Sequence, residues 1–210
     1  MSIEELENNK IPIGHVNLVG VGRLGIRIGM NLIQVHRGGP SKITAFDSQK
    51  ISQSDIIFKM LGGKLGEYKV DFLSSLCTHP EYLRKIVSIK EDLTEGNLDL
   101  LRGDVVSIEI AGGNTISTTA AIIKRAHQIG AKTISTAGVF GVGEEKILTM
   151  DISQADEYNP VVRELREHGI EENHRIITTG KFIEDNIPIT PYVLDDYARE
   201  MTKEILKLLV

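Results

Sequence analysis

The chain has 210 residues, a formal net charge of −5, one cysteine and no tryptophan. This length suits one domain, and the single cysteine, Cys77, excludes an intrachain disulfide and a four-thiolate zinc site. Charges of both signs are interspersed, no apolar run approaches the ~20 residues of a membrane span, and the acidic start lacks a signal-peptide pattern, so we expect a cytoplasmic protein without nucleic-acid or membrane partners.

The first elements in chain order are predicted to be a strand, a helix and a second strand. His15 to Gly20 is a buried apolar run, and apolar residues from Leu24 to Val35 recur at helical spacing before the break at Gly38-Gly39-Pro40. Lys42 to Phe46 is the second predicted strand, and it ends at Asp47. Strands in such a unit pair in parallel through a right-handed crossover.

Strands and helices continue to alternate along the chain. The further predicted helices begin at Ser54-Asp55, cover Tyr68 to Leu76 ahead of Pro80, run from Ile116 to Gly130, cover Pro160 to Glu167, and close the chain with the stripe Val193, Tyr197, Met201, Ile205 and Leu208. The further predicted strands are Lys85 to Ile89, Val105 to Ile110, Lys132 to Thr136, Lys146 to Met150 and Arg175 to Thr179. This order predicts an α/β fold with a Rossmann-like, doubly wound, mainly parallel sheet whose ligand crevice lies at the carboxyl ends of the strands. Within one domain we expect a lead-in over 1–14, a nucleotide-binding core over 15–136 and a less regular C-terminal part over 137–210.

A glycine-rich turn, Gly20-Val21-Gly22-Arg23-Leu24-Gly25, joins the first strand to the first helix. Glycines let a ligand approach the backbone, and the amino end of a helix attracts an anion, so the turn indicates a phosphate site. Taken alone this signal is weak, because NAD enzymes, flavoproteins and methyltransferases use the same turn. Arg23 is either a phosphate contact or a solvated surface residue.

Together with the turn, two later residues point to ATP more than to NAD. Asp47 lies about 20 residues past the turn, where a carboxylate can accept both ribose hydroxyls, and the alternative is a loop or capping aspartate. A carboxylate there also argues against NADP, whose extra phosphate it would repel. Lys69, in the segment Gly66-Glu67-Tyr68-Lys69, adds a cation that a dinucleotide site does not explain.

In this combination the sequence resembles the ThiF/MoeB and ubiquitin-activating family of adenylating enzymes. In that family the glycine turn is followed by an acidic residue, a Ser-Asn-Leu-x-Arg-Gln segment and Gly-x-x-Lys on a helix. Here residues 47–59 and 66–69 keep the same spacing. The family's Asn is replaced by Asp55, and its Arg-Gln pair is replaced by Phe58-Lys59, which leaves Lys59 as the cation of that segment.

The resemblance implies that a substrate carboxylate attacks the α-phosphorus of ATP, that pyrophosphate leaves, and that magnesium bridges the phosphates. It makes Lys69 the phosphate clamp and Lys59 a second catalytic cation, for its own or for a neighbouring subunit. The nucleotide contacts that it implies are Gly20, Gly22, Arg23, Leu24, Gly25, Asp47, Gln49, Ser54, Asp55 and Lys69.

The family's magnesium-binding aspartate falls on Ala111 or Gly112, so that carboxylate is missing. Either Glu109, near the same strand end, takes its place, or ATP phosphates and water hold the metal. The alternative for Glu109 is a capped or paired acid at a strand end.

Other family members transfer an acyl group to a cysteine or bind zinc through two Cys-x-x-Cys pairs, for which this chain has no thiols. Cys77 lies away from the transfer position, so we expect the chemistry to stop at the adenylate of a small acid. In its short length and lack of zinc and thiol ligands, the chain resembles a family member that adenylates the carboxylate of guanylylpyridinol during synthesis of the iron-guanylylpyridinol (FeGP) cofactor. The family resemblance also implies a homodimer and a product that can pass to a downstream enzyme. Gly138 to Gly143, with Phe140 inside, is either a substrate-side loop or a plain turn.

Two other functions remain open at this point. An NAD-dependent dehydrogenase would use the glycine turn and Asp47 in the same way, but it leaves Lys69 unexplained and no His or Tyr is an evident catalytic residue. A non-catalytic adenine-nucleotide-binding module is favoured by the missing metal aspartate.

Overall fold

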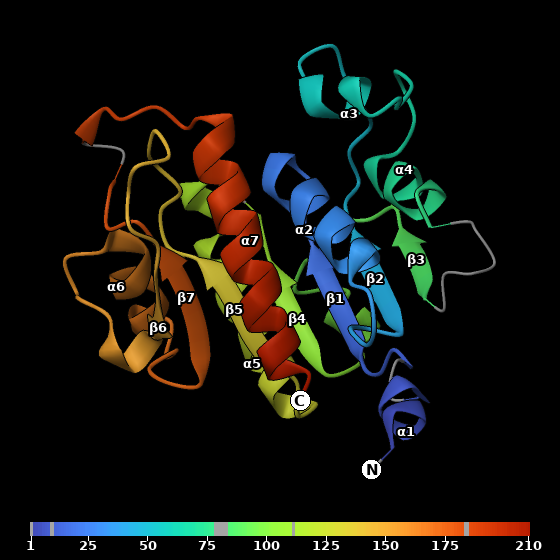
Figure 1. Cartoon of the computed structure of the whole chain (residues 1–210). Helices are drawn as coiled ribbons and strands as arrows, with labels where there is room; N and C mark the ends of the chain where they lie inside the picture. Colours follow the sequence, from blue (N-terminus) through green and yellow to red (C-terminus); the bar gives the residue numbers. More distant parts are fainter. Residues whose placement is uncertain (1, 9–10, 78–83, 111, 183–184) are drawn as a thin grey trace.

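The computed structural model describes residues 2–8, 11–77, 84–110, 112–182 and 185–210; Pro80 and Ala111 lie outside them. One seven-stranded sheet in the order β3-β2-β1-β4-β5-β7-β6 forms its centre (Figure 1). The strands are β1 (His15–Val19), β2 (Lys42–Phe46), β3 (Lys85–Ile89), β4 (Val105–Ile108), β5 (Lys132–Thr136), β6 (Leu148–Asp151) and β7 (His174–Thr178). All neighbours pair in parallel except β6 and β7, so the predicted α/β, mainly parallel sheet is confirmed.

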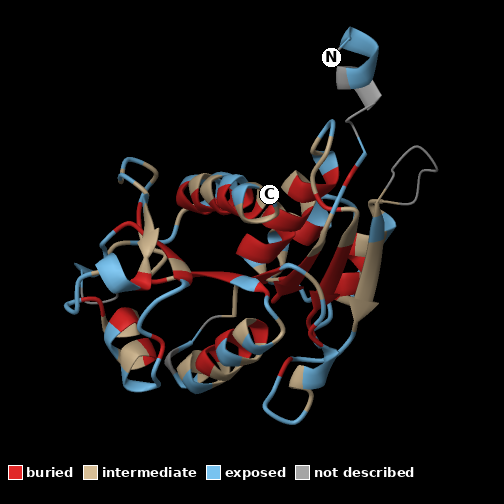
Figure 2. Cartoon of the chain, turned by 90° about the horizontal axis from the view of Figure 1, so that it is seen from below, coloured by how far each residue is buried: buried red, intermediate tan, exposed pale blue. Residues whose placement is uncertain are grey.

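Helices cover both faces of this sheet, as Figure 2 shows in the view along its edge. One face carries α2 (Arg23–Gln34), α4 (Lys69–Ser75) and α7 (Pro191–Leu208), and the opposite face carries α5 (Ile116–Gln128) and α6 (Pro160–Glu167). The shorter elements are α1 (Ile3–Asn8), α3 (Ile56–Met60) and the 3₁₀ turns η1 (Leu98–Leu100), η2 (Gly113–Thr115) and η3 (Ile152–Gln154). Both layers bury mainly Ile, Leu and Val, the usual filling of a covered parallel sheet.

Strand β4 is shorter than predicted, because it ends at Ile108 and not at Ile110. Its partner β1 ends at Val19, and the chain turns away at Gly20, whose φ of 98° leaves the extended region. The last bond between the two is donated by the Glu109 N–H to the Val19 carbonyl, at 2.8 Å. The two strands therefore separate at their carboxyl ends, where the strand order of a doubly wound sheet reverses and ligands bind.

Two further boundaries in the last third differ from the prediction. β6 begins at Leu148 instead of Lys146, and it runs antiparallel to β7 at the edge of the sheet. β7 begins at His174 instead of Arg175. The terminal helix α7 begins at Pro191, where the Thr190 hydroxyl accepts the Val193 N–H, and it packs along α2 (Figure 1).

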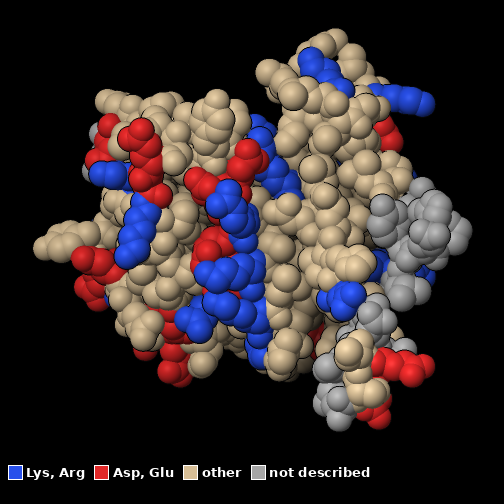
Figure 3. Space-filling view, in the orientation of Figure 1, with Lys and Arg blue, Asp and Glu red and all other residues tan. Residues whose placement is uncertain are grey.

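The surface that carries α7 shows positive and negative side chains next to one another (Figure 3). Part of this pattern comes from ion pairs one turn apart on the helix, Lys203 with Glu200 and Lys207 with Glu204. None of the described helices is both long enough and apolar enough to cross a bilayer.

Candidate active site

A cavity of about 680 Å³ lies at the carboxyl ends of the central strands. Its first end is formed by the glycine turn and the segment after β2: Gly22, Arg23, Leu24, Gln49, Asp55 and Lys69. Its other end is mainly apolar, with Val139, Phe140, Val161, Phe182, Ile189 and Leu194. Among the described lining residues, the only cations are Arg23 and Lys69, both at the first end. The cavity thus has a cationic half and an apolar half.

The three glycines of the turn have different roles. A Cβ added at Gly25 would lie 2.0 Å from the carbonyl oxygen of Gly20, so the turn itself requires glycine there. Gly22 has an ordinary φ of −78°, and an added Cβ would meet nothing within 4 Å. Because Gly22 borders the cavity at the amino end of α2, it leaves space for a ligand to reach the N–H groups of the first helical turn.

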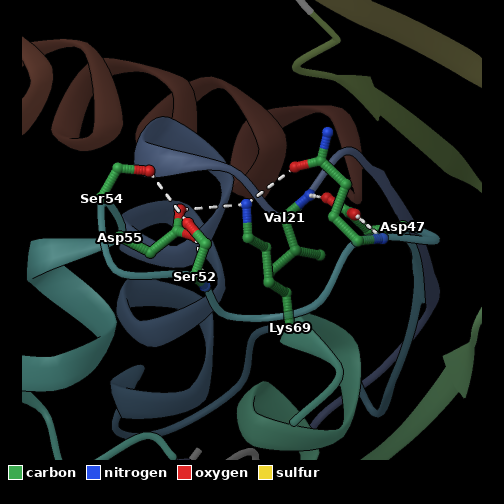
Figure 4. A network of polar contacts seen from close by, with 7 residues as sticks. Val21, Asp47, Ser52, Ser54, Asp55 and Lys69 are labelled. Atoms are coloured by element: carbon green, nitrogen blue, oxygen red, sulfur yellow. Dashed lines mark hydrogen bonds and ion pairs between the residues drawn. The ribbon is translucent and has the colours of Figure 1, made fainter. Parts of the chain in front are cut away.

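Asp47 lies directly behind the turn and is buried. Its carboxylate accepts the N–H of Val21 at 2.8 Å and the N–H of Gln49 at 2.7 Å (Figure 4). Burial raises the pKa of this carboxyl, and the two backbone hydrogen bonds and the charge of Lys69 partly offset that effect. Asp47 therefore ties the end of β2 to the turn. It is not among the described residues that line the cavity, and its contact with ribose stays a prediction.

Lys69 is buried at the start of α4, with its ammonium group at the cavity. Its Nζ lies 2.8 Å from Gln49 Oε1 and 3.1 Å from Asp55 Oδ1 (Figure 4). Burial of Asp55 acts to raise its pKa, but hydrogen bonds from Ser52 and the contact with Lys69 outweigh it, and the pKa is lowered. Three of the predicted nucleotide contacts, Gln49, Asp55 and Lys69, thus meet in one place although they lie up to 20 residues apart.

The remaining members of the same segment lie farther out. Lys59 is exposed on α3, and its Nζ donates to the Gln53 carbonyl at 2.7 Å. Ser54 is exposed and shares a hydrogen bond with Ser52. Neither Lys59 nor Ser54 is among the described residues that line this cavity. Asp55 occupies the N-cap position of α3, but its carboxylate accepts from Ser52 instead of capping the helix.

Glu109 borders the cavity beside the glycine turn, within 4 Å of Cβ positions built at Gly20 and Gly25. One carboxyl oxygen accepts the Ser107 hydroxyl, and the other, Oε2, is buried without a hydrogen-bond partner among the described residues. Burial raises the pKa of this carboxyl well above its ordinary value, because a buried site disfavours the charged form. In the described ranges, no three His, Cys, Asp or Glu side chains gather as a metal site.

The segment after β5 forms part of the apolar half. Gly138, Val139 and Phe140 line the cavity, and hydrogen bonds hold the segment at both ends. The Tyr197 hydroxyl on α7 donates to the Gly138 carbonyl at 2.5 Å, and the Thr179 hydroxyl donates to the Phe140 carbonyl at 2.8 Å. This segment is therefore a tethered wall of the cavity and more than a plain turn.

Several lining residues were not predicted from the sequence. They include Phe182 of the apolar end, together with Thr119, Ser135, Thr136 and Glu164. Ser135 and Thr136 close the predicted strand over 132–136, so the rule that ligands bind at the carboxyl ends of parallel strands would have found them. Thr119, Glu164 and Phe182 carry no such local signal.

The chain was compared with known protein families, curated proteins and solved structures. No protein-family model matches the chain. An uncharacterized protein of Methanocaldococcus jannaschii, MJ0693, is 44% identical over 209 residues, covering 100% of this chain and 82% of the relative. The solved structure of HcgE from Methanothermobacter marburgensis, bound to guanylylpyridinol and ATP, is 50% identical with a TM-score of 0.92, and covers 96% of this chain and 97% of that one.

A more distant structure shares the fold alone. The E. coli tRNA N6-threonylcarbamoyladenosine dehydratase TcdA, in complex with ATP, superposes with a TM-score of 0.78 at 15% identity. The match covers 98% of this chain and 88% of TcdA.

Proposed function

We infer the function from one premise: this chain belongs to the HcgE family, within the ThiF-like adenylyltransferase superfamily. We propose that it is an ATP-dependent adenylyltransferase that activates the carboxylate of guanylylpyridinol. The observation that carries the proposal is one cavity with a cationic half at a glycine turn and an apolar half beyond it. This division matches the two ligands, ATP and guanylylpyridinol, that HcgE holds in its solved structure.

In this proposal the triphosphate lies at the amino end of α2, next to Gly22, with Arg23 and Lys69 beside it. The N–H groups and the two cations stabilise the phosphate charge, which is the main task of a protein in phosphoryl and nucleotidyl transfer. A carboxylate oxygen of the acid attacks the α-phosphorus, and the bond to the bridging oxygen of pyrophosphate breaks. The products are the acyl adenylate and pyrophosphate.

Lys69 is paired with Asp55 at the edge of the proposed phosphate site. A bound phosphate then competes with Asp55 for the ammonium group or shares it. Because the carboxylate holds the side chain in position, little side-chain entropy is lost when phosphate binds.

Magnesium fits this site through Glu109. The unpartnered Oε2 is a buried oxygen next to the glycine turn, which suits a hard cation held mainly by phosphates and water. When bound, the ion would neutralise charge on the phosphates.

We expect Glu109→Gln to separate metal use from nucleotide binding. The uncharged amide matches the carboxyl in shape, and burial already disfavours the charged form of Glu109, so ATP affinity measured without magnesium should change less than about threefold. The magnesium concentration that gives half-maximal activity should rise about tenfold or more, because an amide oxygen is a weaker ligand. A titration of activity against magnesium measures this, and an unchanged curve would remove Glu109 from the metal site.

The function itself is tested in two steps. First, ATP, AMP and NAD are compared as stabilising ligands in a thermal-shift assay, and ATP should raise Tm most. Second, radiolabelled pyrophosphate should exchange into ATP only when guanylylpyridinol is added, and not with its methyl ester. Stabilisation by NAD without stabilisation by ATP, or no exchange with guanylylpyridinol, would contradict the proposal.

We also propose a homodimer in which α3 meets the partner. This short helix stands away from the body of the molecule (Figure 1), and Ile56, Met60 and Leu65 near it are more than half exposed. Lys59 on the same helix is then placed to act in a neighbouring site. The acyl adenylate is a reactive product, which supports a downstream enzyme that accepts it. The use of ATP supports a cytoplasmic location.

A further inference from the structure

A chain of hydrogen bonds crosses the protein from the cavity wall to the far side of β5 and β7. Ser135 lines the cavity, and its Oγ lies 2.8 Å from Nε2 of His174, which is fully buried. His174 Nδ1 lies 2.8 Å from the Thr133 hydroxyl. The Thr133 hydroxyl lies 3.2 Å from Nε2 of His127 on α5, and that nitrogen is 3.1 Å from the Asn173 carbonyl.

The Asn173 carbonyl sets the direction of this chain, because a carbonyl can only accept. His127 Nε2 must therefore carry a proton, and the Thr133 hydroxyl cannot donate to it. The Thr133 proton has two acceptors left: His174 Nδ1 at 2.8 Å and the Asn173 carbonyl at 3.5 Å. The shorter contact is the better hydrogen bond, so Thr133 donates to His174.

His174 then has a defined tautomer. Its pKa is lowered to about 3, mainly by burial and next by the charge of His127, so the ring is neutral and carries one proton. Because Nδ1 accepts from Thr133, this proton is on Nε2 and is donated to Ser135 Oγ. The proton of the Ser135 hydroxyl is then free to be donated to an acceptor in the cavity. The hydrogen bonds from Thr133 to His174 and from His174 to Ser135 point the same way and polarise this hydroxyl.

A substrate carboxylate in the apolar half of the cavity requires a hydrogen-bond donor there. The two cations among the described lining residues, Arg23 and Lys69, are at the end of the cavity that the glycine turn forms, where the triphosphate is proposed to bind. Glu109 and Glu164 also line the cavity, but neither side chain supplies a positive charge for an acid, and Glu109 lies beside the glycine turn. A carboxylate that waits beside the α-phosphorus must therefore be held by neutral donors, and Ser135 is one whose proton direction is set by the fold.

We propose that the Ser135 hydroxyl donates a hydrogen bond to the carboxylate of the acid substrate, and that His174 is a positioning residue that keeps this hydroxyl in its donating orientation. This inference rests on the proposed adenylation of a carboxylate. In this proposal Ser135 contacts the acid substrate and does not contact ATP. It also excludes Ser135 as an acyl acceptor, because a neutral imidazole without a carboxylate partner is a poor acceptor for the serine proton.

The test measures pyrophosphate exchange as a function of guanylylpyridinol concentration, together with ATP affinity by calorimetry. Ser135→Ala should raise KM for the acid roughly 10- to 100-fold, the usual loss when a hydrogen bond to a charged group is removed. ATP affinity should stay within about twofold of the wild type. Ser153→Ala, which alters an exposed serine of η3 that bonds to Asp151, is the matched control.

Two variants of His174 separate positioning from packing. The amide N–H of His174→Gln can replace Nε2–H, so this variant should retain most of the affinity for the acid. His174→Leu keeps the volume but donates nothing, and its KM for the acid should rise as in Ser135→Ala.

An unchanged KM in Ser135→Ala, an equal loss in the Gln and Leu variants, or an acyl group found on Ser135 by intact mass would each overturn the assignment. If the wild-type protein shows exchange with the acid and Ser135→Ala has the same KM for the acid, only this inference fails. If the wild-type protein shows no exchange with the acid, the proposed function fails together with it.

Discussion

Replacing Lys69 with Met is expected to lower pyrophosphate exchange by roughly 100- to 1,000-fold, the usual cost of removing a group that stabilises transition-state charge. Its ammonium group faces the cationic half of the cavity, and Arg23 is the other described lining cation there. The loss should appear in kcat as well as in KM for ATP, because the phosphate charge changes most as pyrophosphate leaves. Steady-state exchange kinetics at varied ATP concentrations measure both terms.

The single variant also leaves Asp55 without its ion-pair partner, which costs up to about 3 kcal/mol of unfolding free energy in a pair this buried. The double variant Lys69→Met, Asp55→Asn removes that charge, so its stability should recover while exchange stays low. Lys90→Met is the control, since Lys90 pairs with Asp71 at the surface and is not among the described cavity residues. Recovery of exchange in the double variant would show that Lys69 acts through stability alone.

Alanine at Gly22 and at Gly25 is expected to produce opposite defects, although both glycines belong to the same turn. At Gly25 the new methyl would lie 2.0 Å from the Gly20 carbonyl oxygen. The turn or α2 must then shift, at a cost on the order of 3 kcal/mol or more. Chemical denaturation should show this loss whether or not ATP is present.

Gly22→Ala should fold normally, within about 1 kcal/mol of the wild type, because its backbone angles suit any residue and the space around it is open. Because Gly22 lines the cavity where the phosphates are proposed to bind, the added methyl should take space from them, and ATP affinity should fall about tenfold or more. Calorimetry on the same samples checks both values. Normal ATP binding by Gly22→Ala would move the triphosphate away from the turn.

Much of the fold was predictable because its signals are local. Apolar periodicity, the glycine turn and the break at Gly38-Gly39-Pro40 act over a few residues. They predicted all seven strands within two residues at each end, and β2, β3 and β5 with both ends correct. Where boundaries failed, the cause was not local. β4 stops at Ile108 because β1 leaves it at Gly20, which apolarity along β4 does not record.

The candidate site divides in the same way. The order of the glycine turn, Asp47 and Lys69 along the chain was enough to favour ATP and an adenylating family. The same order did not reveal that Asp47 holds the turn through Val21, or that Lys69 pairs with Asp55. Lys59, predicted as a second cation, is not among the described residues that line this cavity, and its role in its own or a neighbouring subunit stays a prediction.

The sequence by itself therefore determined the type of sheet, the glycine turn and the choice of Lys69 as the candidate phosphate-binding cation, since each depends on residue types at short, regular spacings. Only the tertiary structure decided which side chains share the cavity and which way their protons point. Ser135 and His174 are 39 residues apart and meet because β5 and β7 are neighbours in the sheet. A hydrogen bond requires two groups within about 3 Å, and strand pairing between distant segments, not their order in the chain, creates that proximity.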